Sequence, residues 1–232
     1  MEQNLSKKTR TESDLIGSRE VPESALYGVQ TLRGIENFRI SKFHLNEYPL
    51  FIQALAITKM GAAVANRELD LLTEEQTDAI LKACKEILEG KHHDQFPVDM
   101  IQGGAGTTTN MNANEVIANR ALELMGHARG EYQYCSPNDH VNRSQSTNDA
   151  YPTAIHIGLY YTHLKLVKHF ATLIEAFRKK GAEFAHIIKM GRTQLEDAVP
   201  MTLGQTFNGF ASILEHELKN LDFAAQDFLT VN

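Results

Sequence analysis

The chain of 232 residues has no tryptophan, only two cysteines, and no apolar run as long as a membrane span. Cys84 and Cys135 make neither a disulfide framework nor a zinc pattern, and no His-Glu-x-x-His motif occurs. We therefore expect no metal site, no other cofactor and no membrane partner. Because the net charge is -6 and no long basic stripe occurs, we expect no nucleic-acid partner either. The first residues lack the apolar region of a signal peptide, which indicates a cytoplasmic protein.

The pattern that is present is mainly helical. Residues 1 to about 48 look irregular, whereas apolar residues recur at helical spacing through much of the remainder. Thr73 and Gln76 form a capping-box pattern, and Gly90 is a helix stop. These features predict helices over residues 51–69, from Thr73 to Gly90, and over about 110–126.

Two longer periodic runs follow, over residues 150–188 and from Pro200 to the end of the sequence. Thr202 and Gln205 repeat the capping-box spacing at the start of the second run. Runs beyond about 25 residues are typical of bundles of long helices. We therefore expect a mainly all-α fold, with a helical N-terminal domain followed by long helices of a bundle. Since the last run ends without a glycine or proline stop, we expect the chain to be the N-terminal part of a longer protein.

Three short polar segments interrupt the helical patterns, at residues 103–112, 144–149 and 191–197. Each is rich in small hydroxyl and amide side chains, and each leads into or lies close before a helix-like pattern. The start of a helix offers free backbone N–H groups and a partial positive charge, which favour a bound anion. Three such segments in one chain predict a pocket for a small polyanion such as a dicarboxylate.

Each segment also has a purely structural interpretation. In the first, the threonines can serve the turn that begins a helix. In the second, residues 146–149 are all good N-cap residues. In the third, Arg192 can form a surface ion pair with Glu196 or Asp197. Taken singly, the segments leave ligand binding and structural roles open.

Taken together and in this order, the segments resemble the aspartase/fumarase superfamily. The resemblance extends over nearly the whole chain, and its motifs lie at residues 17–22, 27–33, 95–99, 102–112, 145–149 and 191–200. Two features resemble the aspartase branch more than the fumarases. Gln194 stands where fumarases usually carry a histidine, and residues 103–107 read Gly-Gly-Ala-Gly-Thr.

The resemblance implies an ammonia-lyase that converts L-aspartate reversibly to fumarate and ammonium through an enediolate-like intermediate. It also implies a homotetramer of largely helical domains, in which the middle domains form one bundle. On that template residues 1–147 are the N-terminal domain, and residues 148–232 are the first part of the bundle domain.

Binding roles follow from the resemblance for the two carboxylates of the substrate. Ser146 and Thr147 would hold the β-carboxylate, on which negative charge develops after a proton leaves Cβ. Donors positioned for such a charge act most strongly in the transition state. Thr107 would help to hold the α-carboxylate.

For the amino group, the resemblance assigns roles to Asn148 and Thr193, with Gln194 nearby. It implies that Thr193 and Gln194 come from a different subunit than Ser146. The family's proton-abstracting serine lies in a Gly-Ser-Ser-x-Met-Pro-x-Lys-x-Asn segment, which does not occur in this sequence. We therefore expect no catalytic base among these 232 residues and no activity of this chain alone.

Three other functions remain open. A fumarate hydratase on the same scaffold is the nearest, although Gln194 argues against it because an ionisable histidine suits the activation of water. A lyase that acts on a larger fumaryl adduct is a second. The third is a non-catalytic helical assembly module, in which the polar segments serve as helix caps alone.

Overall fold

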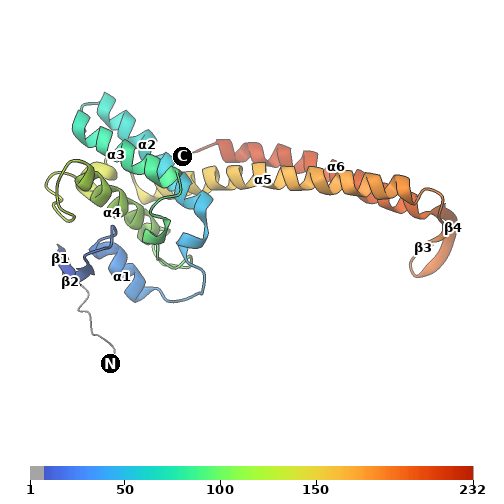
Figure 1. Cartoon of the computed structure of the whole chain (residues 1–232), viewed down its shortest axis with the longest axis horizontal. Coiled ribbons are helices and arrows are strands. Elements are labelled where there is room, and N and C mark those ends of the chain that lie inside the picture. The colour runs from blue at the N-terminus through green and yellow to red at the C-terminus, as the bar shows by residue number, and fades with distance from the viewer. Residues whose placement is uncertain (1–7, 232) are drawn as a thin grey trace. The chain divides into compact units, whose positions relative to one another are not determined.

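The structure, a computed structural model, describes residues 8–231. The chain divides into two compact units, one reaching Gly158 and the other extending from Leu159 to Thr230. Both are built mainly from α-helices (Figure 1), which confirms the expected all-α class. The helices are α1 (Val29–Asn37), α2 (Pro49–Glu68), α3 (Glu74–Leu88), α4 (Thr107–Leu124), α5 (Thr147–Glu183) and α6 (Leu203–Ala225). Short helical turns lie at Leu45–Glu47, His93–Gln95, Pro137–Val141 and Gln226–Leu229.

The N-terminal region is more regular than its sequence indicated. An antiparallel hairpin of β1 (Thr9–Asp14) and β2 (Gly17–Pro22) precedes α1, so the expectation of an irregular segment up to residue 48 was wrong. Glu12 and Val21 are the buried side chains of the two strands. Because each strand buries a single side chain, the sequence shows no apolar alternation that would predict a strand.

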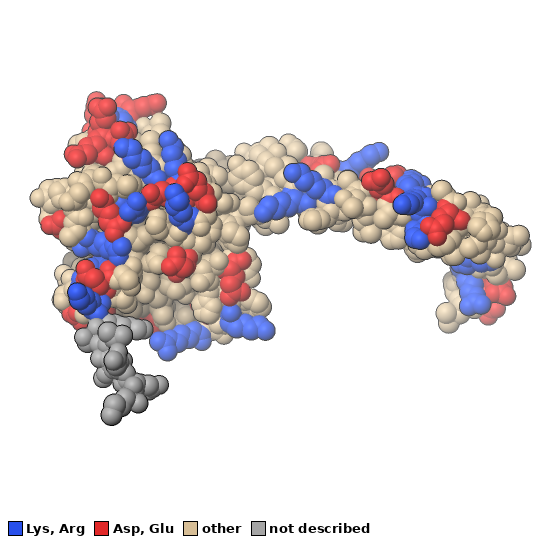
Figure 2. All heavy atoms as spheres, viewed as in Figure 1, with Lys and Arg blue, Asp and Glu red and all other residues tan. Residues whose placement is uncertain are grey.

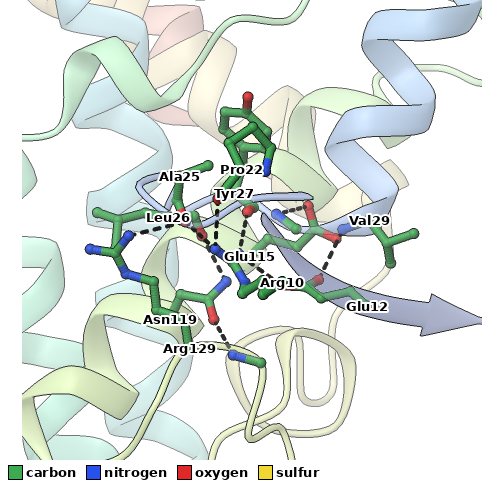
Figure 3. A network of polar contacts seen from close by, with 12 residues as sticks. Arg10, Glu12, Pro22, Ala25, Leu26, Tyr27, Val29, Glu115, Asn119 and Arg129 are labelled. Atoms are coloured by element: carbon green, nitrogen blue, oxygen red, sulfur yellow. Dashed lines mark hydrogen bonds and ion pairs between the residues drawn. The ribbon is translucent and has the colours of Figure 1, made fainter. Parts of the chain in front are cut away.

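Polar contacts with distant backbone groups hold this hairpin in place (Figure 3). The guanidinium of Arg10 donates to the carbonyl oxygens of Ala25 and Tyr27 at 2.7 and 2.8 Å. Oε2 of Glu12 accepts a hydrogen bond from the backbone N–H of Val29 at 3.0 Å. The hairpin is thus stabilised by hydrogen bonds to the segment that leads into α1.

The start of α1 is fixed by a buried carboxylate from α4. Glu115 accepts backbone hydrogen bonds, at 2.8 to 2.9 Å, from Gly28, Gln30 and Thr31. These N–H groups have no partner inside the helix, and a carboxylate satisfies them as a capping side chain does. Burial nevertheless dominates and raises the pKa of Glu115. The residue joins α1 to α4 (Figure 3).

The core of the first unit lies between α2, α3 and α4, which pack in sequence order, and α1 packs on α4. The predicted capping box is confirmed, since the hydroxyl of Thr73 accepts a hydrogen bond from the N–H of Gln76 at the start of α3. Gly90 follows the end of α3 with a φ of +87°, as a glycine stop requires. The helix predicted over 110–126 is α4 and begins three residues earlier than expected, at Thr107.

In the second unit α5 and α6 pack against each other in antiparallel orientation. Arg178 on α5 pairs with Glu215 on α6 at 2.7 Å, and His163 pairs with Asp222 at 2.8 Å. The capping box at Thr202 is confirmed at the start of α6. The helical run predicted over 150–188 is present in α5, which begins at Thr147 and ends at Glu183.

A hairpin that the sequence did not predict joins these two helices. Strands β3 (Ile188–Thr193) and β4 (Glu196–Thr202) pair antiparallel around a turn at Gln194 and Leu195. Both turn residues have positive φ, 48° and 70°, where asparagine and glycine are the usual residues. The strands are exposed along most of their length, so their residues lack the alternation that indicates a half-buried strand.

The surface carries charges of both signs. Figure 2 shows Lys and Arg side chains interspersed with Asp and Glu on the face drawn, over both units. Within residues 8–231, no helix has the length and apolar character that crossing a membrane requires.

Candidate active site

The segment before α4 is held by two polar side chains. Asp99 accepts backbone hydrogen bonds, at 2.6 to 2.9 Å, from Ile40, Ser41 and Ile101. Burial opposes its ionisation, but these donors and the Ser41 hydroxyl lower the pKa of Asp99 to about 2. Gln102 accepts a hydrogen bond from the N–H of Thr109 and donates to its hydroxyl oxygen. Both side chains therefore fix the loop from which α4 starts.

The loop then makes a tight turn through three residues with left-handed backbone. Gly104, Ala105 and Gly106 have φ values of +78°, +50° and +85°. Gly106 is the buried N-cap residue of α4, and a Cβ there would stand 2.4 Å from the ring of Tyr151 on α5. A glycine at this position is needed for the backbone angle and also for the close approach.

Ser146 caps the start of α5. Its hydroxyl oxygen accepts a hydrogen bond from the N–H of Asn148 at 3.2 Å, and Oδ2 of Asp149 accepts one from the Ser146 N–H at 3.2 Å. This arrangement is a capping box with aspartate in the place of glutamate. The hydroxyl hydrogen of the exposed Ser146 takes no part in these bonds, so it is free to donate to a ligand.

Thr147, the first residue of α5, is half-buried and touches a side chain of α4. Its Oγ1 lies 3.2 Å from Nδ2 of Asn110, which donates to it. Asn110 in turn lies 2.7 Å from the ammonium of Lys59 on α2, a side chain with no solvent exposure. Burial lowers the pKa of Lys59 to about 7. A buried amine and a polar network therefore lie directly behind Thr147.

A cavity of about 430 Å³ lies between the turn before α4 and the first turns of α5. It is lined by Met100, Gln102, Ala105, Gly106, Asn148, Tyr151, Pro152 and Ile155. The volume is in the range of small-molecule sites, about 300 to 1,000 Å³. Pro152 lies inside α5 and has no N–H, so the Asn148 carbonyl loses the helical hydrogen bond that residue 152 would otherwise donate. Among the predicted site residues, Asn148 lines this cavity.

Thr107 is exposed at the start of α4, and its hydroxyl serves the turn. Oγ1 donates to the carbonyl oxygen of Gly104 at 2.6 Å. This hydrogen bond agrees with the structural interpretation of the threonine. To donate to a carboxylate, the hydroxyl would have to rotate away from Gly104.

Thr193 and Gln194 lie in the second unit, at the end of β3 and in the turn that follows it. Both are exposed. The ion pair considered for this segment forms between Arg192 and Asp197, at 3.4 Å on the exposed surface. The first unit thus contains Thr107, Ser146, Thr147 and Asn148, whereas Thr193 and Gln194 belong to the other unit.

Sequence reasoning missed the residues behind Thr147. Lys59 lies in the helix expected over residues 51–69, four residues from Leu55 and from Ala63 on the apolar face of α2. A lysine inside an apolar stripe was the available signal, because lysine is almost never fully buried without a partner. Asn142 and Gln145 also contact Lys59; Gln145 belongs to the polar segment 144–149, whereas Asn142 lies in none of the three segments.

Neither cysteine is a reactive group. Cys84 and Cys135 are fully buried, and burial raises the pKa of each thiol to about 12. A thiol with such a pKa stays protonated near neutral pH and is a poor nucleophile. Cys84 is a small residue of the hydrophobic core.

Comparison with known proteins gives a consistent result. Residues 17–231 match the model of a protein family described as lyase. An aspartate ammonia-lyase of Pseudomonas fluorescens is 58% identical over 221 residues, which are 95% of this chain and 46% of the relative. An aspartate ammonia-lyase of Escherichia coli K12 is 54% identical over 98% of this chain and 48% of its own length. The chain thus spans about half the length of the curated relatives it matches.

Solved structures agree with this result. A fumarate lyase:delta crystallin from Brucella melitensis in native form superposes with a TM-score of 0.94 and 51% identity, over 97% of this chain and 52% of that one. A class II fumarase from Schistosoma mansoni superposes with a TM-score of 0.88 and 35% identity, over 97% and 47% of the two chains. Since the family model matches nearly all of the sequence, this chain belongs to that family of lyases.

Proposed function

We propose that the protein carrying this chain is an aspartate ammonia-lyase, which converts L-aspartate reversibly to fumarate and ammonium. The observation that most supports it is the start of α5, where the hydroxyl residues Ser146 and Thr147 directly precede Asn148, which lines a cavity of suitable size. The relatives of that name, at 54 to 58% identity, support the same assignment. The substrate would be a small dicarboxylate.

In the proposed mechanism, Ser146 and Thr147 bind the β-carboxylate. Removal of a proton from Cβ places a second negative charge on this carboxylate, and the amine then leaves from the opposite face. Both hydroxyls and the N-terminal end of α5 face that developing charge. Loss of one such donor commonly lowers kcat by about 10² to 10³.

The remaining groups would orient the rest of the substrate. Thr107 would bind the α-carboxylate after its hydroxyl leaves the Gly104 carbonyl. Asn148, at the cavity wall, would contact the amino group together with Thr193 and Gln194. No Gly-Ser-Ser-x-Met-Pro-x-Lys-x-Asn segment occurs in this sequence, so the proton-abstracting serine would lie in the length that the relatives have beyond the match.

We further propose that the protein is a cytoplasmic homotetramer, in which Thr193 and Gln194 of one subunit serve the Ser146 site of another. On this proposal residues 1–147 form the N-terminal domain and residues 148–232 the first part of the bundle domain. Large apolar side chains of the second unit support an assembly because they are exposed in the single chain; they include Leu166, Leu173, Ile213 and Phe223. Exposed apolar side chains of this kind mark protein interfaces.

The experiment joins this chain to the segment that follows it in its relatives and compares fumarate formation from L-aspartate and from L-malate. Turnover of aspartate alone supports the proposal. Turnover of malate alone supports the second candidate, a fumarate hydratase. The 35% identity of this chain to a class II fumarase is the observation that favours this candidate. If neither substrate yields fumarate and the affinity for fumarate is unchanged in a Ser146→Ala variant, a helical assembly module is favoured.

A further inference from the structure

Lys59 has an unusual environment for a buried cation. Its Nζ donates hydrogen bonds, at 2.7 to 2.9 Å, to the amide oxygens of Asn110, Asn142 and Gln145. These hydrogen-bond partners are neutral amides and not carboxylates. Three acceptors satisfy the three hydrogens of an ammonium. The charge is thus stabilised by neutral oxygens, all of which lie close to the start of α5.

Backbone carbonyls fix the orientation of two of these amides. Nδ2 of Asn142 donates to the carbonyl oxygen of Gln145, and Nε2 of Gln145 donates to the carbonyl oxygen of Val141. A carbonyl accepts and cannot donate, so the nitrogen of each amide must face it. The oxygens of Asn142 and Gln145 therefore point toward Lys59.

The orientation of Asn110 follows from two independent neighbours. The ammonium form of Lys59 can only donate, so Oδ1 of Asn110 must face it. Oδ1 of Asn142 can only accept, so Nδ2 of Asn110 must face that atom, at 3.1 Å. Both constraints give the same orientation, and the Asn110 nitrogen consequently points at Oγ1 of Thr147, 3.2 Å away.

The chain of bonds ends at the hydroxyl of Thr147. Because Oγ1 accepts from Asn110, the single hydrogen of the hydroxyl must point elsewhere. In the part of the chain that the structure describes, the hydrogen bond of this hydroxyl is the one that it accepts from Asn110. We infer that Lys59 and Asn110 are positioning residues that force the Thr147 hydroxyl to act as a hydrogen-bond donor toward the substrate carboxylate. This inference rests on the proposed function of Thr147.

The arrangement has a consequence for the strength of that donor. A cation at the start of a hydrogen-bond chain polarises each following bond, so Thr147 becomes a better donor to an anion. A dicarboxylate bound at Thr147 would in turn favour the charged form of Lys59. We call this chain of hydrogen bonds, from Lys59 through Asn110 to Thr147, the relay. It places positive charge near the developing enediolate while the ammonium itself remains buried.

The first test reverses the polarity of the relay with Asn110→Asp. A carboxylate only accepts, so the Thr147 hydroxyl would donate to residue 110 and not to the substrate. We expect kcat/KM for L-aspartate to fall by about 10² to 10³, as for the loss of one oxyanion donor. Because Lys59 gains an ionic partner, the urea midpoint should fall less than in the matched control Asn119→Asp. Asn119 is equally buried on α4 and bonds the Leu26 carbonyl.

The control separates a positioning role from a structural one. Asn119→Asp should lower the urea midpoint more than Asn110→Asp does. It should lower kcat/KM of the folded enzyme by less than about threefold. A second comparison uses Thr147→Val, which removes the hydroxyl. If Asn110 acts through Thr147, adding Asn110→Asp to Thr147→Val should change kcat/KM by less than about threefold. Two outcomes would overturn the inference. In the first, the losses of kcat/KM from Asn110→Asp and Thr147→Val multiply in the double variant. In the second, kcat/KM falls in proportion to the loss of stability in both Asn→Asp variants.

A measurement on the 232-residue chain does not depend on activity. The side-chain amide resonances of Asn110 in ¹H–¹⁵N spectra should shift in Thr147→Val and in Lys59→Met, since each removes one partner. Unchanged resonances in both variants would refute the relay itself. If the resonances shift but the extended protein forms no fumarate from L-aspartate, the relay stands and the proposed function fails.

Discussion

Gly106 and Tyr151 approach so closely that a methyl group on residue 106 would stand 2.4 Å from the tyrosine ring. This contact joins the turn before α4 to the second turn of α5, and both residues line the cavity. The polar segments at 103–112 and 144–149 are thus held together by a packing contact as well as by the Asn110–Thr147 hydrogen bond.

Replacing this glycine should therefore disturb the site more than a backbone effect alone would. Gly106→Ala combines a residue with Cβ at φ +85° with a clash against Tyr151. The backbone part costs about 1 kcal/mol, and overpacking adds roughly 1 to 3 kcal/mol. Urea unfolding of the 232-residue chain measures the sum.

Gly90→Ala is the matched control. Gly90 has nearly the same φ, +87°, but a Cβ there meets no atom within 4 Å. It should lose only the backbone part, about 1 kcal/mol. Equal losses in the two variants would show that the contact with Tyr151 is unimportant. Tyr151→Ala should reduce the additional loss in Gly106→Ala.

Ser146→Ala should affect both stability and activity. It removes the cap of α5, which stabilises the chain by about 0.5 to 2 kcal/mol. In the extended enzyme it should also lower kcat by about 10² to 10³, because a donor to the β-carboxylate is lost. Thr73→Ala removes a comparable cap from α3, away from the cavity. An equal loss of kcat in Thr73→Ala would contradict a binding role for Ser146.

The buried amine of Lys59 should make stability depend on pH. Burial lowers its pKa from 10.5 to about 7 in the folded chain. Below pH 7 both states hold the proton, and the folded state bears the cost of the buried charge. Between pH 7 and 10.5 the unfolded chain binds more protons, so this group makes stability rise with pH, by at most about 1.4 kcal/mol per pH unit.

Lys59→Met should lack this contribution. The neighbouring thiol of Cys84 does not interfere, because burial raises its pKa to about 12 and it stays neutral over the range. Unfolding free energies of both proteins at pH 7, 8 and 9 provide the measurement. Parallel pH profiles would mean that Lys59 keeps an ordinary pKa in the folded chain.

The proposed tetramer predicts complementation between subunits. Ser146→Ala and Thr193→Val should each be nearly inactive in the extended enzyme. If every site takes Ser146 from one subunit and Thr193 from another, random mixing leaves both residues intact in about a quarter of the sites. Activity that reappears when the two variants are refolded together would support this arrangement. Complete inactivity of the mixture, with tetramers present, would argue that one subunit provides both residues.

The sequence by itself determined the long helices after residue 48 and the capped starts of α3 and α6. Helical periodicity and the capping boxes at Thr73 and Thr202 depend on residues three or four positions apart, so they can be read without the fold. The polar segments around Thr107 and Ser146 can also be recognised from neighbouring residues alone, because N-cap residues and glycines stand directly before the helices they begin.

Tertiary structure decided the rest. The N-terminal hairpin is held by bonds from Arg10 and Glu12 to a distant segment, and the strands beside Gln194 show no buried alternation, so neither hairpin has a local pattern. The surroundings of Lys59 need residues that are 51 to 86 positions apart to meet, and the cavity likewise combines residues before α4 with residues of α5. A sequence pattern can place a lysine on the apolar face of a helix. Which oxygens surround it, and which way the Thr147 hydroxyl must then point, depends on the packing of α2 and α4 with the loop before α5.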